Sequence, residues 1–285
     1  MKKVTKTSSN LLHFLAGLFV RPAAALCLTV FFLITPASSS GAGDVIFFYS
    51  SETNVNNFKS LKMKFDQYLS ELGSYEFQPF NDRMVFEQYI KDKRNGFLLL
   101  SSWHYNHIYR EYGLKPVLVG TKGGKKYQKM ILATKGESGK DDLLAIDPLA
   151  SASSVAYTRS VLRGMLRQKE TTDSVSILTV PKDIDALVSV GFGMSKSALA
   201  AESTLDQLKT INPALYKEVK VMAEGRESLS LVLAAPKNWE PLNAAMLKII
   251  KEMPLGSRGK ELIEMIGLDG WKELDPADVQ KLESK

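Results

Sequence analysis

The sequence is poor in the residues that most enzymes use for chemistry. Among 285 residues it has one cysteine and three histidines. The cysteine, Cys27, lies in an apolar run near the N-terminus, so a chain cleaved after that run would have no thiol and no disulfide framework. The sequence has no Gly-x-Ser-x-Gly elbow, no Gly-Lys-Ser/Thr phosphate loop and no complete dinucleotide fingerprint. We therefore expect no catalytic residues, no cofactor and no metal, and we interpret the chain as a binding protein rather than an enzyme.

The first 42 residues predict a secretory signal peptide. Three lysines in the first six residues precede an apolar run at 23–34, and small residues follow up to Ala42. We expect cleavage near Ala42 and a periplasmic location. The alternative is an uncleaved anchor, because residues 11–34 are long enough to span a bilayer, although Arg21 interrupts that run.

The charge balance argues against a nucleic-acid partner. The chain has a formal net charge of +6, but residues 1–42 carry four basic side chains and no acidic one. The remainder has 33 basic and 31 acidic residues, a net charge of +2. This excess is too small for strong binding to the phosphate backbone of a nucleic acid. We interpret the basic cluster at 122–126 as a solvated hairpin turn. Contact with a membrane is expected only through the N-terminal signal or anchor.

Strand and helix patterns alternate over the first part of the remaining chain. Short apolar runs predict strands, and apolar residues at helical spacing predict helices. The strands are expected at 45–49, 75–79, 97–100 and 117–120, and the helices at 54–72, from Asp82 onward and at 103–112. This order is typical of a parallel α/β sheet with right-handed crossovers.

A second α/β unit is expected after a strand at 130–134 and a polar linker at 136–142. Its strands are predicted at 143–146, 175–180, 219–223 and 229–234, and the helices of the remaining chain at 151–167, 182–189, 195–211, 239–252, 257–266 and 276–282. We predict a signal peptide at 1–42, a first lobe at 43–134, a second lobe at 135–226 and a return to the first lobe at 227–285. Such lobes place a cleft between the carboxyl ends of their sheets.

Serines follow the carboxyl ends of several predicted strands, where helix N-termini offer free N–H groups to an anion. The strongest candidates for oxyanion binding are Ser151, Ser153 and Ser154, and the alternative for them is ordinary helix capping. Glu52 would repel an anion if it pointed into the cleft. The other candidates for contact with a ligand are Ser50, Ser51, Thr53, Ser101, Ser102, Trp103 and Tyr127.

Two histidines form a His-x-x-His pair at His104 and His107. On a helix these side chains can share one face and hold a metal ion. The sequence offers no cysteine and no acidic residue at a recognisable metalloenzyme spacing beside them. We therefore predict no metal site here.

The order of the motifs resembles the solute-binding proteins of phosphate/phosphonate-type ABC transporters, which have the type II periplasmic-binding fold. The similar segments are a Gly-x-x-Pro step at 113–117, a Tyr-x-x-x-Ile/Leu strand from 127, an Asp-Pro loop with serines at 147–154, a second-lobe helix and turn at 185–193, and a closing Leu-to-Trp segment at 262–271. The chain departs from the family at Ala152, where the family has Thr, and at Gly96 and Lys196, where it often has Asp.

The resemblance implies a secreted, two-lobed receptor. It would close over a small oxyanion, such as phosphate or a phosphonate, and deliver it to an ABC permease in the membrane. One alternative is a sensory or orphan binding protein of the same fold that signals to a membrane partner. Another, from a different class, is an exported enzyme that uses the cleft, which a pair of titratable groups with perturbed pKa values in the cleft would favour.

Overall fold

A computed structural model describes residues 44–52, 57–91, 96–136, 146–166, 169–237 and 244–284. The predicted signal peptide, Thr53, and most of the predicted linker at 136–142 lie outside these residues. Residues 42–285 form one unit by their internal contacts, and everything below concerns this unit. Within the described residues, no helix is long and apolar enough to cross a membrane.

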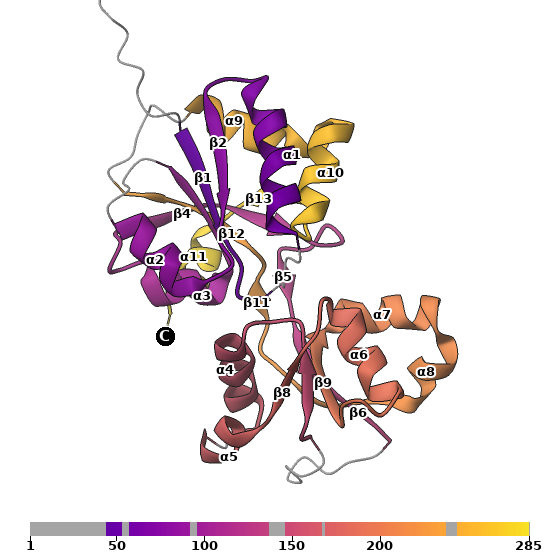
Figure 1. Cartoon of the computed structure of the whole chain (residues 1–285). Coiled ribbons are helices and arrows are strands. Elements are labelled where there is room, and N and C mark those ends of the chain that lie inside the picture. The colour runs from indigo at the N-terminus through magenta and orange to yellow at the C-terminus, as the bar shows by residue number, and fades with distance from the viewer. Residues whose placement is uncertain are drawn as a thin grey trace, which may run out of the picture. The chain divides into compact units, whose positions relative to one another are not determined.

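The first sheet combines segments from both ends of the described chain (Figure 1). Its strand order is β13-β4-β12-β3-β1-β2. The bounds are β1 Asp44–Tyr49, β2 Tyr75–Pro79, β3 Phe97–Leu100, β4 Leu114–Thr121, β12 Val232–Pro236 and β13 Gly270–Glu273. Strand β1 is parallel to β2 and β3, whereas β12 is antiparallel to β3 and β4, and β13 is antiparallel to β4. The sheet is therefore mixed, not purely parallel as predicted.

The second sheet has five strands in the order β10-β6-β9-β7-β8. The bounds are β6 Met130–Lys135, β7 Leu149–Ser151, β8 Ile177–Thr179, β9 Ser197–Ala201 and β10 Val219–Glu224. A separate two-stranded pair joins β5 (Tyr127–Gln128) to β11 (Ser228–Leu229), where the chain passes from the first sheet to the second and returns. Because β6 belongs to the second sheet, the predicted lobe boundary at 134–135 does not match the sheets.

Helices pack on both faces of each sheet. In the first half, α1 (Phe58–Ser70), α9 (Ala244–Glu252) and α10 (Ser257–Met265) share a core cluster on one face. The other face packs against α2 (Arg83–Lys91), α3 (Ser102–Ile108) and α11 (Pro276–Glu283). The helices of the second half are α4 (Val155–Leu166), α5 (Lys169–Ser174), α6 (Asp183–Gly191), α7 (Glu202–Ile211) and α8 (Pro213–Glu218), and a 3-10 turn, η2 (Met253–Leu255), precedes α10.

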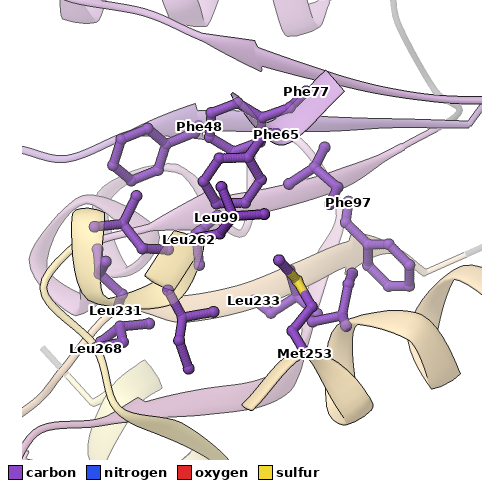
Figure 2. Close-up of a cluster of buried hydrophobic side chains, with 14 of the residues drawn as sticks. Phe48, Phe65, Phe77, Phe97, Leu99, Leu231, Leu233, Met253, Leu262 and Leu268 are labelled. Atoms are coloured by element: carbon purple, nitrogen blue, oxygen red, sulfur yellow. The ribbon is translucent and has the colours of Figure 1, made fainter. Parts of the chain in front are cut away.

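The core of the first half explains why its central strands β1 and β3 have continuous apolar runs. Residues of β1 point alternately to the two helix layers, so Phe48 joins one cluster and Phe47 the other. In Figure 2, Phe65 from α1 lies against Phe77 from β2, with ring centroids 4.0 Å apart. The predicted stripe on the first helix is confirmed where it faces the sheet, because Leu61, Phe65 and Leu69 are buried.

Two segments differ from their predicted structure. Residues 195–211 were predicted as one helix, but Ser197–Ala201 is a fully buried strand, β9, and only α7 is helical. The strand predicted at 143–146 is not found at Ile146, which lies in a turn, and residues 143–145 lie outside the described part. The neighbouring strand is β7, so Ser151 ends a strand instead of beginning a helix. Elements α5, α8 and β13 were not predicted.

Candidate functional site

Five serines at or just after strand ends lie in one place. We call them the serine cluster. Ser51 follows β1, Ser101 follows β3 and caps α3, and three more lie at the end of β7 and the start of α4. The full set is Ser51, Ser101, Ser151, Ser153 and Ser154. All are buried except Ser154, which is half-buried.

The first-half members of the cluster are bonded to each other. The hydroxyls of Ser51 and Ser101 are 2.6 Å apart. The Ser101 hydroxyl also accepts a hydrogen bond from the backbone N–H of His104 at 3.2 Å, which satisfies one of the free donors of α3. The Ser101 hydroxyl thus caps α3 and at the same time reaches the loop after β1. The capping alternative given for the serines at 151–154 is confirmed at Ser154, whose hydroxyl accepts the N–H of Tyr157 at 3.3 Å.

The second-half members connect the two halves. The N–H of Ser154 donates to the carbonyl oxygen of Ser51 at 2.8 Å, and the hydroxyl of Ser153 donates to the carbonyl oxygen of Glu52 at 3.1 Å. The hydroxyl of Ser151 lies 3.0 Å from that of Thr158 and accepts the N–H of Ser153 at 3.1 Å. Thus the donors at the start of α4 form hydrogen bonds with carbonyl oxygens of the first half.

Glu52 places a carboxyl group beside this cluster. Its side chain is 8% exposed, and this burial raises its pKa to about 7, although Lys122 and Gln128 act in the opposite direction. Gln128 Nε2 donates to Oε2, while Oε1 is buried without a hydrogen-bond partner among the described residues. Near neutral pH this group is therefore partly neutral, which reduces the repulsion of an anion that the sequence suggested.

A second carboxyl group with a raised pKa belongs to Asp183, in the first turn of α6. Burial raises this pKa, opposed by a hydrogen bond from the backbone N–H of Ala201 to Oδ2 at 3.1 Å. The other oxygen, Oδ1, is buried and has no partner in the described part of the chain. The charge of Asp183 also acts on Glu52 and on the Tyr157 phenol. The site therefore contains a pair of carboxyl groups in addition to hydroxyls and amides.

Several other predicted site residues lie outside the cluster. The Tyr127 hydroxyl donates to Asp278 on α11 at 2.5 Å, a bond that raises its pKa to about 12. Tyr127 lies in β5, where the chain passes between the sheets, but its phenol already has an acceptor. The Ser102 hydroxyl donates to the carbonyl oxygen of Leu229 at 2.6 Å. The Ser50 hydroxyl accepts from the N–H of Glu52 at 3.3 Å. Thr53 lies outside the described residues.

The two histidines point to different partners. His104 is buried, and its Nε2 lies 2.8 Å from Oε1 of Glu87; burial lowers its pKa to about 4. His107 is exposed, and its Nδ1 lies 2.7 Å from the carbonyl oxygen of Trp103. Among the described residues, no group of three or more His, Cys, Asp or Glu side chains could hold a metal ion.

Three positions depart from the pattern of the family that the sequence resembles. Ala152 lies among the donors of the serine cluster, whereas Gly96 and Lys196 lie away from them. Ala152 is buried between Ser151 and Ser153, where a threonine would add a hydroxyl. Lys196 is exposed next to β9. Gly96 precedes β3 with φ of 155°, and a Cβ there would lie 2.6 Å from the Phe47 ring. Close packing therefore explains Gly96 without a ligand.

The groups that surround Glu52 were not predicted as site residues from the sequence. Gln128 and Lys122 are linked, since Lys122 Nζ donates to Gln128 Oε1 at 3.3 Å. Lys122 directly follows β4, and Gln128 lies in β5. Asp183 reaches the site from α6. Lys122 belongs to the basic cluster at 122–126, which was interpreted as a solvated turn, and Gln128 and Asp183 belong to no motif. Only proximity in the fold therefore identifies these groups as neighbours of Glu52. The one available signal was Glu52 itself, an acidic residue in a serine loop after a buried strand.

The fold is similar to that of known binding proteins. XAC2383 from Xanthomonas citri, in a structure bound to ATP, superposes with a TM-score of 0.60 at 14% identity, over 85% of this chain and 96% of that one. A binding-protein component of an ABC phosphonate transporter from Pseudomonas aeruginosa gives 0.59 at 12% identity, over 85% and 86%. PhnD1 from Prochlorococcus marinus, in complex with methylphosphonate, gives 0.59 at 9% identity, over 85% and 96%.

No protein-family profile and no curated protein sequence matches this chain. At these low identities the structural similarity establishes the fold. The chain has the two-lobed type II periplasmic-binding fold that the order of its motifs predicted.

Proposed function

We propose that the protein is an exported solute-binding receptor that closes over a small oxyanion and delivers it to an ABC permease. The observation that carries this proposal is the pair of hydrogen bonds from Ser153 and Ser154 to carbonyl oxygens of the loop after β1. These donors lie at the N-terminus of a 12-residue helix, α4. Such positions favour negative charge.

In this proposal an oxyanion competes with these two carbonyl oxygens for the same donors. Separation of the lobes would free the Ser154 N–H and the Ser153 hydroxyl. An oxyanion entering the open cleft would accept the same two hydrogen bonds and would bring the Ser51–Ser101 pair back against it. Binding then favours closure because the ligand supplies acceptors that hold both halves together.

The ligand class is proposed from the donor set and from the neighbours. Hydroxyls and backbone amides bind phosphorus oxyanions without side-chain charge. Two structures of similar fold contain ATP and methylphosphonate, which differ in size and share phosphorus–oxygen groups. We therefore propose a phosphate- or phosphonate-like ligand.

Thermal unfolding with a panel of anions tests this proposal. Phosphate, methylphosphonate, sulfate and acetate are added to the full chain, and one phosphorus oxyanion is expected to stabilise it. At a hundredfold excess over its dissociation constant, the gain is about 2.7 kcal/mol. The double variant Ser151→Ala/Ser153→Ala is expected to lose this ligand-induced gain, because Ser151 positions Ser153 and the hydroxyl of Ser153 is a donor.

The control is Ser189→Ala, which removes a buried serine of the same half. The Ser189 hydroxyl donates to the carbonyl oxygen of Asp185 within α6, so its loss leaves the cluster intact. This variant should retain the full ligand-induced gain. If the double variant retains it as well, the cluster is not the binding site; if no anion stabilises the wild type, the ligand class is wrong.

The carboxyl pair of Glu52 and Asp183 favours a second candidate function, an exported enzyme that uses the same cleft. Both groups have raised pKa values, and such groups are common in active sites. Phosphorus NMR of methylphosphonate or a phosphate monoester incubated with the protein distinguishes the two functions. A receptor returns the compound unchanged, whereas conversion that disappears in Glu52→Gln would establish catalysis.

A further inference from the structure

A cavity of about 450 Å³ lies close to the serine cluster but contains none of its five residues. It is lined by α3 and α11 of the first half, by α4 of the second, and by residues 225–229, where the chain returns to the first sheet. Among the predicted site residues, Ser102 and Trp103 contribute to it. Its volume falls in the usual range for small-molecule sites, about 300–1,000 Å³, and far exceeds the volume that one oxyanion needs.

One wall of the cavity is aromatic and fixed in orientation. The rings of Trp103 and His107 have centroids 4.3 Å apart, and Tyr157 meets the Trp103 ring edge-on at 5.8 Å. The indole N–H of Trp103 donates to the Ser160 hydroxyl at 3.0 Å, across from α3 to α4. This bond holds the indole in place, so a planar ligand would find a stacking surface that is already formed.

The rim of the cavity carries positive charge. Arg226 is exposed and forms no ion pair within the described part of the chain. Lys281 also lines the cavity, with its ammonium group 4.0 Å from the centre of the Tyr127 ring and 3.8 Å from Glu227. Arg226 is thus a guanidinium group available to a carboxylate or another planar anion.

We infer that this cavity is a second binding site, which takes a planar aromatic acid with its ring against Trp103 and its acidic group at Arg226. The aromatic wall selects a flat ring, and the guanidinium selects an anion over its neutral analogue. The site differs from the serine cluster in size and in chemistry. This inference does not rest on the proposed transport function.

Titration calorimetry of the full chain with indole-3-acetate tests the inference, with indole-3-acetamide as the neutral analogue. Indole-3-acetate is expected to bind with a dissociation constant below about 100 μM, and the amide about tenfold more weakly. Arg226→Gln is expected to reduce the affinity for the acid to that for the amide. An absence of binding, or equal affinity of the wild type for both compounds, would overturn the inference.

A blocking variant locates the binding. Gly164 on α4 lines the cavity, and a Cβ built there meets no atom within 4 Å, so Gly164→Phe can fill the cavity without a backbone clash. It is expected to weaken indole-3-acetate binding at least tenfold. The control Gln207→Phe adds the same side chain at an exposed position of α7, outside the cavity, and should bind like the wild type. Unchanged affinity in Gly164→Phe would also overturn the inference.

Discussion

Glu52→Gln is expected to stabilise the protein by about 3 kcal/mol at pH 8. The wild-type carboxyl group is ionised at that pH although it is buried and one of its oxygens has no hydrogen-bond partner in the described structure. The amide carries no charge, so its burial costs less, and its oxygen can still accept the hydrogen bond from Gln128.

The effect should depend on pH in a defined direction. The folded-state pKa of Glu52 is raised from its usual 4.5 to about 7, so the folded protein keeps a proton that the unfolded chain releases. The contribution of the protonated Glu52 carboxyl group to the stability of the wild type is therefore fully present below about pH 4.5 and is lost as the pH rises through about 7. Urea unfolding of wild type and variant should show little difference near pH 4.5 and the full difference at pH 8.

Glu111→Gln is the matched control, because Glu111 is exposed. Its substitution should change stability by less than about 0.5 kcal/mol at either pH. A stability difference between Glu52→Gln and wild type that is equal at pH 4.5 and pH 8 would show that the carboxyl group is not held in the buried state described above.

Gly259→Ala is expected to destabilise the protein by about 3 kcal/mol. Gly259 lies in the first turn of α10, and a Cβ there would be 2.3 Å from the carbonyl oxygen of Met253 and 2.8 Å from its Cα. Backbone atoms cannot turn away as a flexible side chain can, so η2 and α10 would have to separate. That movement would disturb the core cluster that contains Met253 and Leu262.

Gly164→Ala makes the same chemical change with the opposite expected result. Gly164 is exposed inside α4, with no atom within 4 Å of the added Cβ. Alanine should stabilise this helix by up to about 1 kcal/mol, because it loses less backbone entropy than glycine on folding. Urea unfolding measures both variants. Equal effects of the two substitutions would contradict the packing of η2 against α10.

The strands and helices of the first half were largely predictable because their side chains fall into two clear patterns. The strand at 75–79 and that at 97–100 were predicted at their observed bounds. The failure at β9 has a physical cause. Ser-Ala-Leu-Ala-Ala has high helix propensity, but Ala198 and Ala200 face a crowded core beneath α6, and β6 and β7 supply backbone partners on both sides. Tertiary contacts therefore override the local preference.

Residues of the candidate site were predictable only where they directly follow a predicted strand, because this places them at the carboxyl edge of a sheet. This rule selected Ser51, Ser101 and Ser153, which lie in one hydrogen-bonded cluster; their contact with a ligand stays a prediction. Tyr127 also lies near the crossing between the sheets, but its partner, Asp278, is 151 residues away in the chain, and no local pattern reveals that bond. Glu52 was judged by its charge, whereas its burial decides its protonation.

The chain leaves the first sheet at β4 and re-enters it at β12, its antiparallel neighbour. All of the second sheet and its helices therefore form one uninterrupted insertion whose two ends lie side by side at the β5–β11 pair. If a single molecule were stretched between Asp44 and Ser284, tension would pass through the first sheet while the insertion stayed slack. The second half would extend only after β4 and β12 had been pulled apart, so rupture of the molecule should follow a fixed sequence of events.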